Sequence, residues 1–191
     1  MSSPRGVVCL DCDGVILDML ASWESIAADK FGPITLHEPA EWDMQKRYGM
    51  DKKQVGKVWD ELDWSRFDPF PGAPEAVHRI VDSGYDLAIV SGIPEEKRKD
   101  RETNLKKVLG FVPYLVLTGS GKADKIPVLQ NLGAYAYVDD LWDHIERAEG
   151  AGIPILGYVA PPDRQHYRYA VPDLKTFVSN FLGEKPSDPV T

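Results

Sequence analysis

Cysteine is scarce in this chain: Cys9 and Cys12 are the only two among 191 residues. Their spacing matches the CxxC pattern of redox and zinc sites. In an extended strand, however, three residues separate the two side chains by about 10 Å, which is beyond disulfide reach. No second cysteine pair is present to complete a zinc site, and the four histidines form no ligand spacing. We therefore expect neither redox nor zinc chemistry.

The chain also lacks a long apolar run and an excess of positive charge. The apolar stretch that precedes Asp11 is too short for a signal peptide, and no segment approaches the roughly 20 apolar residues of a membrane helix. The net charge of -8 repels polyanions such as nucleic acids. We therefore expect a cytoplasmic globular protein whose partner is a small molecule, not a membrane or a nucleic-acid polymer. The sequence leaves open whether the protein is a monomer or a homodimer.

What the chain does have is an alternation of short apolar runs with helical patterns. The apolar runs predict buried strands at residues 7–10, 87–90, 114–117, 134–138 and 153–158. The helical patterns predict helices at residues 73–83, 94–110, 127–132, 141–151 and 172–182. Strands and helices in alternation form a parallel sheet that helices cover on both faces. The fold class is therefore predicted to be α/β, Rossmann-like.

One segment interrupts this alternation. From Asp18 to about Phe70 the sequence has helical patterns but no strand pattern, and Asp51 with Gln54 predicts a helix start there. We interpret the segment as a small helical cap inserted after the first strand. The core domain is then 1–17 and 71–183, and the cap is 18–70. Residues 184–191, rich in proline and charge, are predicted to be a loose tail.

Reactive side chains follow four of the predicted strands. Because the carboxyl ends of parallel strands meet at one edge of a sheet, we expect these side chains to share a cleft. Residues two apart in an extended segment face the same side about 6.6 Å apart, so two acids after the first strand can flank one reacting group. In chain order the side chains belong to Asp11 and Asp13, Ser91 with Gly92, Lys122 and Lys125, and Asp139 with Asp140.

Several carboxylates in one cleft are unfavourable unless a cation neutralises them. Oxygen ligands, with no suitable histidine or cysteine, favour a hard ion such as Mg²⁺. Ser91 and one of the two lysines would then bind the oxygens of an anion that also touches the metal. A phosphoryl group fits that description.

The segments DCDGV, LAIVSG, GKADK and YVDDLWD, in this order, resemble the four motifs of the haloacid-dehalogenase superfamily of phosphohydrolases. The resemblance runs from Val7 to about Tyr158. It implies that Asp11 is a nucleophile that forms an aspartyl-phosphate and that Asp13 is the general acid and base. Ser91 would bind the phosphoryl oxygens, and Lys125 or Lys122 would offset charge in the transition state. Mg²⁺ would be held by Asp11, Asp139 and the backbone carbonyl of Asp13, with Asp140 and Asp143 as further acids of the metal site.

A narrower resemblance concerns the substrate. The run KVWDELDWSRFDPFPGAPEAV is similar to the return from cap to core in the 5'(3')-deoxyribonucleotidase branch. It implies a phosphatase of nucleoside monophosphates, with Gly92 at the substrate and with Trp59, Trp64 and Phe67 stacking on the base. The other cap tryptophans, Trp23 and Trp42, are expected in the core of the cap. The basic run from Lys97 to Lys107 has interleaved acids and is expected to be a solvated helix face.

Three alternatives remain beside the nucleotidase. The same site would serve a sugar-phosphate phosphatase. A signalling receiver domain also gathers acids, a hydroxyl and a lysine around Mg²⁺, although its phosphoacceptor follows the third strand and it needs no cap. A binding module of this fold without activity would not need the complete set of reactive groups.

Overall fold

The computed structural model describes residues 5–38, 41–121 and 123–183, so the predicted tail and Lys122 lie outside the described residues. Six parallel strands form one sheet in the order β3-β2-β1-β4-β5-β6. The strands are β1 (Val7–Leu10), β2 (Asp86–Ser91), β3 (Tyr114–Leu117), β4 (Ala134–Asp139), β5 (Ile155–Val159) and β6 (Ala170–Val171). The predicted α/β, Rossmann-like fold is confirmed. The strand β6 was not predicted, because its two residues show no detectable period.

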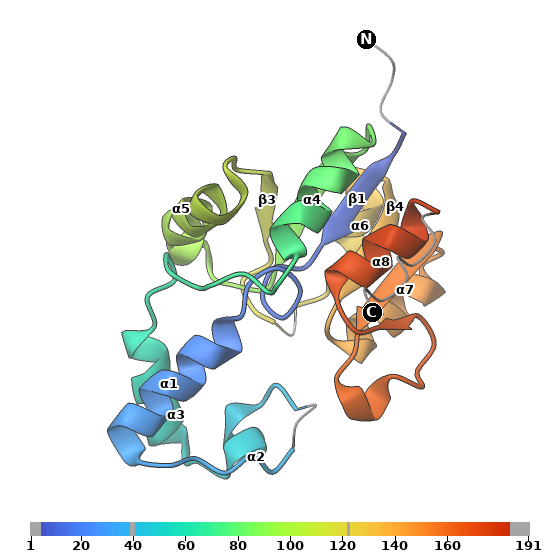
Figure 1. Ribbon diagram of the computed structural model, residues 1–191. Coiled ribbons are helices and arrows are strands. Elements are labelled where there is room, and N and C mark those ends of the chain that lie inside the picture. Colours follow the sequence, from blue (N-terminus) through green and yellow to red (C-terminus); the bar gives the residue numbers. More distant parts are fainter. Residues whose placement is uncertain (1–4, 39–40, 122, 184–191) are drawn as a thin grey trace, which may run out of the picture.

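Helices cover both faces of the sheet (Figure 1). One face of the sheet packs against a layer formed by α4 (Ala73–Asp82), α5 (Arg98–Leu109) and α8 (Leu174–Phe181). The other packs against α6 (Ile126–Leu132) and α7 (Trp142–Gly150). Successive residues of β1 alternate between these layers: Val8 and Leu10 face the first and Cys9 faces the second, all without solvent exposure. A strand buried on both faces has to be apolar throughout, which explains the run that precedes Asp11.

The segment 18–70, which we interpret as a cap, contains α1 (Met19–Phe31), α2 (Met44–Tyr48) and α3 (Lys52–Glu61), with α1 and α3 side by side (Figure 1). Asp51 caps α3 as predicted, because its Oδ1 accepts a hydrogen bond of 2.8 Å from the Gln54 N–H. Inside the cap the ring of Trp23 stacks on that of Tyr48 at a centroid distance of 5.2 Å. Aromatic rings thus form part of the core of this small unit, together with aliphatic residues such as Met19, Met44 and Val58.

Two linkers join the cap to the core, and they are hydrogen-bonded to each other. The Asp18 N–H donates to the Asp68 carbonyl at 2.8 Å, and the Phe70 N–H donates to the Ile16 carbonyl at 2.9 Å.

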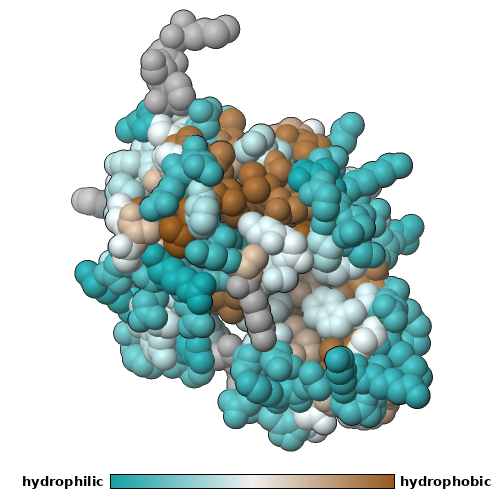
Figure 2. Space-filling model, turned by 180° about the vertical axis from the view of Figure 1, so that it is seen from behind, coloured by the Kyte–Doolittle hydropathy of each residue, from teal (hydrophilic) through white to brown (hydrophobic). Residues whose placement is uncertain are grey.

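Seen from behind, the core has an apolar area with hydrophilic borders, and the cap surface below it is mostly hydrophilic (Figure 2). Among the described helices, none combines the length and hydropathy needed to cross a bilayer.

Candidate active site

The carboxyl ends of the central strands deliver the predicted side chains to one edge of the sheet. Asp11 follows β1, Ser91 is the last residue of β2, and Asp139 is the last residue of β4. Lys125 precedes α6 and joins two of these strand ends. Its Nζ lies 2.9 Å from Asp11 Oδ1 and 2.9 Å from Asp139 Oδ2. The structure therefore brings together residues that lie more than a hundred positions apart, as the parallel topology requires.

Lys125 is a buried cation, with 3% of its surface exposed. Burial alone would lower the pKa of its ammonium, but the carboxylates of Asp11 and Asp139 hold the pKa above its ordinary value. The lysine is therefore charged at neutral pH. It neutralises part of the negative charge of the site and fixes the two carboxylates relative to each other.

Asp139 is enclosed by hydrogen-bond donors of the protein itself. Its Oδ2 contacts Lys125, the hydroxyl of Tyr137 and, at 3.0 Å, Nδ1 of His144; its Oδ1 accepts a hydrogen bond of 2.8 Å from the Leu141 N–H. Burial opposes ionisation, but Lys125, His144 and Tyr137 together hold the pKa of Asp139 well below its usual range. Asp139 is thus an ionised carboxylate whose oxygens already have partners.

Asp140 has a different environment. Its Oδ2 accepts a hydrogen bond of 3.0 Å from the indole Nε1 of Trp42, a residue of the cap. Burial, and then the negative charges of Asp139 and Asp11, raise the pKa of Asp140 well above its ordinary value. Gly14 makes this packing possible, because a Cβ at that position would lie 2.1 Å from Asp140 Oδ2 and its φ of +83° favours glycine.

Asp11, Asp139 and Asp140 each offer a carboxylate oxygen, and these three oxygens lie within 4.8 Å of one another. Burial raises the pKa of Asp11 to about 6, Lys125 opposes the rise, and the charges of Asp139 and Asp13 add to it. Three acids against one lysine leave an excess of negative charge that a hard cation would neutralise. The all-oxygen donor set fits Mg²⁺. Asp11 and Asp140 suit this role better than Asp139, because the oxygens of Asp139 are occupied by protein donors.

Ser91 ends β2 with a hydroxyl that is fully buried and has no hydrogen-bond partner among the described residues. A buried hydroxyl without a partner is costly, which is consistent with a binding role for its Oγ. Gly92 is needed for packing: a Cβ there would lie 2.6 Å from the Cα of Gly121, in the loop after β3. Lys122, the alternative to Lys125, follows Gly121 in the sequence but lies outside the described residues.

Asp13 pairs with a residue that the sequence reading did not select. Nη2 of Arg101 lies 2.7 Å from Asp13 Oδ2, and the arginine has no solvent exposure. Burial disfavours the charged guanidinium, but Asp13 outweighs it and raises the pKa of Arg101 further above its usual range. The expected solvated helix face between Lys97 and Lys107 therefore does not include Arg101, whereas Lys99, Lys106 and Lys107 are exposed. The signal was present, since Arg101, Asn104 and Leu105 share one stripe of α5 with Leu109, and all four are buried.

Asp143 and the expected base-stacking aromatics are not among the residues that line the cavity beside the acids. Asp143 is exposed in the first turn of α7, and the next residue, His144, is the one that faces Asp139. Trp64 and Phe67 are buried and pack edge to face, while Trp59 stacks on Trp64. Trp64 and Phe67 also lie against the guanidinium of Arg101, and the cavity is lined by other residues.

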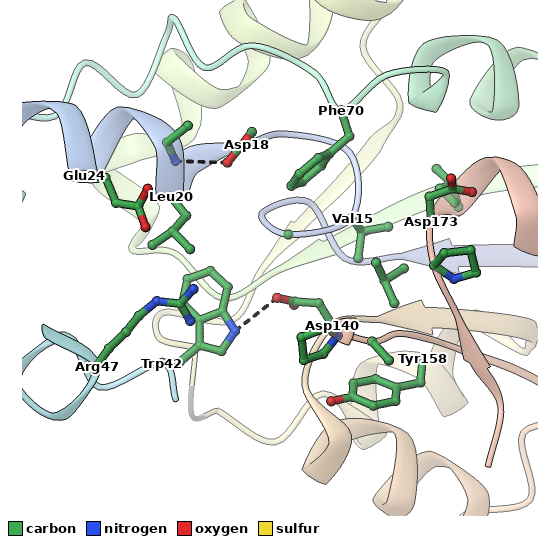
Figure 3. Close-up of a pocket in the computed structure, with 17 residues that line it drawn as sticks. Val15, Asp18, Leu20, Glu24, Trp42, Arg47, Phe70, Asp140, Tyr158 and Asp173 are labelled. Atoms are coloured by element: carbon green, nitrogen blue, oxygen red, sulfur yellow. Dashed lines mark hydrogen bonds between the residues drawn. The ribbon is translucent and has the colours of Figure 1, made fainter. Parts of the chain in front are cut away.

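That cavity has a volume of about 370 Å³ and lies between the cap and the core (Figure 3). Asp140 forms part of its wall, next to the glycine turn at Gly14. The cap contributes Trp42, which was expected in the interior of the cap, with Glu24 and Arg47. The core contributes Tyr158 and Asp173 among others. A molecule in this cavity would touch Asp140 of the carboxylate cluster on one side and cap side chains on the other.

No family model matches this sequence, and no curated protein matches it. Solved structures do resemble it. A conserved haloacid-dehalogenase-like protein of unknown function from Agrobacterium tumefaciens is 16% identical, with a TM-score of 0.65 over 93% of this chain and 97% of that chain. The chain has the haloacid-dehalogenase-like fold.

Two further structures share this haloacid-dehalogenase-like fold over nearly their whole length. One, from Thermotoga maritima, is assigned as a beta-phosphoglucomutase and is 17% identical, with a TM-score of 0.64 over 94% of this chain and 99% of that chain. The other, from Lactobacillus delbrueckii subsp. bulgaricus, is assigned as a phosphoglycolate phosphatase and is 16% identical, with a TM-score of 0.60 over 96% and 100%. None of these three is named as a nucleotidase, so the deoxyribonucleotidase branch stays a prediction.

Proposed function

We propose that this protein is a Mg²⁺-dependent phosphomonoesterase that acts on a small phosphorylated metabolite through an aspartyl-phosphate on Asp11. The observation that supports it most strongly is the contact of Lys125 with both Asp11 and Asp139, at 2.9 Å each, beside Asp140. A buried lysine among several acids is suited to a phosphoryl group, and the neighbouring strand β2 ends in a buried serine hydroxyl without a partner among the described residues. The names of two structural neighbours, a phosphoglycolate phosphatase and a beta-phosphoglucomutase, agree with phosphoryl chemistry.

In the first step a carboxylate oxygen of Asp11 attacks phosphorus, and the bond between phosphorus and the leaving-group oxygen breaks. Asp13, two residues on, gives a proton to that oxygen, so the product leaves as an alcohol. In the second step Asp13 takes a proton from water, which attacks phosphorus and releases phosphate from Asp11. A bound Mg²⁺ ion would reduce the charge repulsion between the Asp11 carboxylate and the phosphoryl group.

Ser91 and Lys125 have separate tasks in this proposal. The Ser91 Oγ is buried at the end of β2 and would donate a hydrogen bond to a phosphoryl oxygen. Lys125 would keep Asp11 ionised and offset the charge that develops on the phosphoryl oxygens. Asp139 would hold Lys125 in place, since it contacts the same ammonium from the other side.

The leaving group would occupy the cavity between the cap and the core. The named functions of the neighbours favour a sugar phosphate or phosphoglycolate over a nucleotide. A nucleoside monophosphate is the second candidate, because the cavity has aromatic side chains at Trp42, Phe70 and Tyr158 on which a base could stack. Trp42 thus replaces Trp59, Trp64 and Phe67 as the proposed stacking residue.

The direct test is phosphate release from a panel of hexose phosphates, phosphoglycolate and deoxyribonucleoside 5'- and 3'-monophosphates, with Mg²⁺ and with EDTA. We expect turnover with Mg²⁺, loss with EDTA, and loss in Asp11→Asn. The Trp42→Ala variant separates the substrate classes: a loss confined to nucleotides favours the second candidate. A stable phosphoprotein without turnover would favour a receiver domain, and no phosphorylation and no turnover would favour a binding module.

A further inference from the structure

Arg101 is a buried charge for which the steps above have no task. It lies on α5, in the core domain, and no part of it is exposed. Arginine is almost never fully buried unless it is paired, and burying its guanidinium is costly. Arg101 lies beside Asp13, a proposed catalytic group, and we infer its role from the groups that it contacts.

The guanidinium of Arg101 is held on several sides. Nη2 lies 2.7 Å from Asp13 Oδ2, and Nη1 donates to Cys12 Sγ at 3.3 Å. The rings of Trp64 and Phe67 lie against it, with centroids 5.6 Å and 5.3 Å from its central carbon. A side chain with this many neighbours has little freedom to change rotamer.

The segment that carries those two rings is itself fixed to α5. One turn beyond Arg101, the buried Asn104 accepts a hydrogen bond of 3.1 Å from the Phe67 N–H and donates one of 2.9 Å to the Phe67 carbonyl. This segment leads from α3 back to the core. Arg101 is therefore enclosed between the loop after β1 and the returning linker of the cap.

The Asp13 carboxylate gains a fixed direction from this arrangement. Arg101 binds one oxygen, Oδ2, while the other, Oδ1, is buried and has no hydrogen-bond partner among the described residues. A carboxyl group held through one oxygen presents the other in a defined orientation. The oxygen without a partner is the one available to carry the proton.

We propose that Arg101 is a positioning residue that holds Asp13 through Oδ2, so that Oδ1 gives its proton to the leaving-group oxygen when the bond to phosphorus breaks. The electron pair of that bond stays on the leaving oxygen, which takes the proton, and Asp13 is left as a carboxylate paired with Arg101. This assignment rests on the proposed phosphomonoesterase function and adds a residue to it.

The test compares two esters in wild type, Arg101→Met and Arg101→Lys. The nitrophenolate of p-nitrophenyl phosphate leaves without a proton, whereas the alkoxide of 2-glycerol phosphate needs one. The ratio kcat/KM covers only the steps up to departure of the leaving group, so the later attack of water does not affect it. We expect Arg101→Met to lose about ten-fold more kcat/KM on 2-glycerol phosphate than on p-nitrophenyl phosphate. Arg101→Lys, which keeps the charge, should lie between wild type and Arg101→Met.

Two controls separate positioning from loss of structure. Arg98→Met removes an arginine of the same helix that pairs with Glu95 and not with Asp13, so its losses on the two esters should be equal. In an Asp13→Asn background, Arg101→Met should cause little further loss on 2-glycerol phosphate, because Arg101 acts through Asp13. Thermal unfolding identifies variants that fail to fold. If Arg101→Met fails to fold, Arg101→Lys provides the test, through its loss of kcat/KM on 2-glycerol phosphate relative to p-nitrophenyl phosphate.

The two proposals fail in different ways. If the wild type hydrolyses both esters and the Arg101 variants lose kcat/KM by the same factor on both, the proposed role of Arg101 is overturned. The phosphatase proposal then still stands. The same holds if Arg101→Met causes its full loss in the Asp13→Asn background. A wild-type protein that releases phosphate from neither ester nor from any member of the metabolite panel overturns the phosphatase proposal, and the role of Arg101 with it.

Discussion

The indole Nε1 of Trp42 donates a hydrogen bond of 3.0 Å to Oδ2 of Asp140, which joins the cap directly to the carboxylate cluster of the core. The two residues are 98 positions apart in the chain, and both line the cavity. A ligand that enters this cavity therefore meets the cap and the cluster at one contact point. Through this contact, a movement of the cap would also move the side chain of Asp140, a proposed metal ligand.

Replacing Trp42 with phenylalanine keeps an aromatic ring but removes the donor. A hydrogen bond to a charged group contributes about 1.5–3 kcal/mol, so we expect KM to rise about ten-fold in Trp42→Phe. Steady-state kinetics on the best substrate of the panel measures it. Trp23→Phe is the matched control, because Trp23 is buried in the same cap but stacks on Tyr48 instead. Kinetics of Trp42→Phe equal to those of wild type would mean that the contact has no role in binding.

Asp139 and Asp140 are neighbours in sequence but should respond differently to substitution by asparagine. Asp139→Asn breaks a buried ion pair with Lys125, which we expect to lower the free energy of unfolding by about 3 kcal/mol and to abolish activity. Asp140→Asn relieves charge repulsion and should leave stability unchanged or higher, while the Mg²⁺ concentration for half-maximal activity rises more than about ten-fold. Urea unfolding and Mg²⁺ titration of activity check the two halves. Equal effects of the two substitutions on stability would contradict these separate roles.

Ser91→Ala should separate stability from activity. The Ser91 hydroxyl is buried without a partner among the described residues, so its removal should raise the free energy of unfolding by about 1 kcal/mol. The same change removes the proposed donor to the phosphoryl group, and kcat/KM should fall about ten-fold. Ser65→Ala is the control, since that hydroxyl bonds to Asp63 on the surface of the linker. A destabilised Ser91→Ala with full activity would show that the hydroxyl serves the fold alone.

Both cysteines should be unreactive in the folded protein. Cys9 and Cys12 are fully buried, and burial raises the pKa of each thiol to about 12, so almost no thiolate forms near neutral pH. We expect no labelling by a disulfide reagent at about pH 8 in native buffer and labelling of both cysteines in guanidinium. Rapid labelling of either one in the native protein would be inconsistent with the packing of β1 and of the loop that follows it.

Much of the fold was predictable because buried parallel strands are apolar along their whole length. The run Val7–Leu10 and the run Tyr114–Leu117 were predicted with the bounds that the structure has. Strand ends were predictable for the same reason, since the first polar residue after such a run marks the edge of the sheet. Asp11, Ser91 and Asp139 were selected in this way; Asp11 and Asp139 both contact Lys125, and Ser91 ends the strand β2, which neighbours β1.

The parts of the site that sequence reasoning missed depend on which way a helix faces. His144 was not selected because the histidines form no ligand spacing, yet the apolar residues Ile145 and Ala148 indicate that position 144 lies on the inner side of α7. Arg101 was hidden by the charged residues around it, although its stripe contains Leu105 and Leu109. Trp42 could not have been placed at all, because its contact with Asp140 depends on how the cap docks on the core. Local patterns contain no information about that docking.

The most direct test of the central claim is mass spectrometry of the protein quenched in acid during turnover with Mg²⁺ and its best substrate. The account predicts a phosphoryl group on Asp11 in the wild type, and neither this adduct nor phosphate release in Asp11→Asn. Phosphate release by Asp11→Asn at the rate of the wild type, with no adduct on either protein, would contradict it.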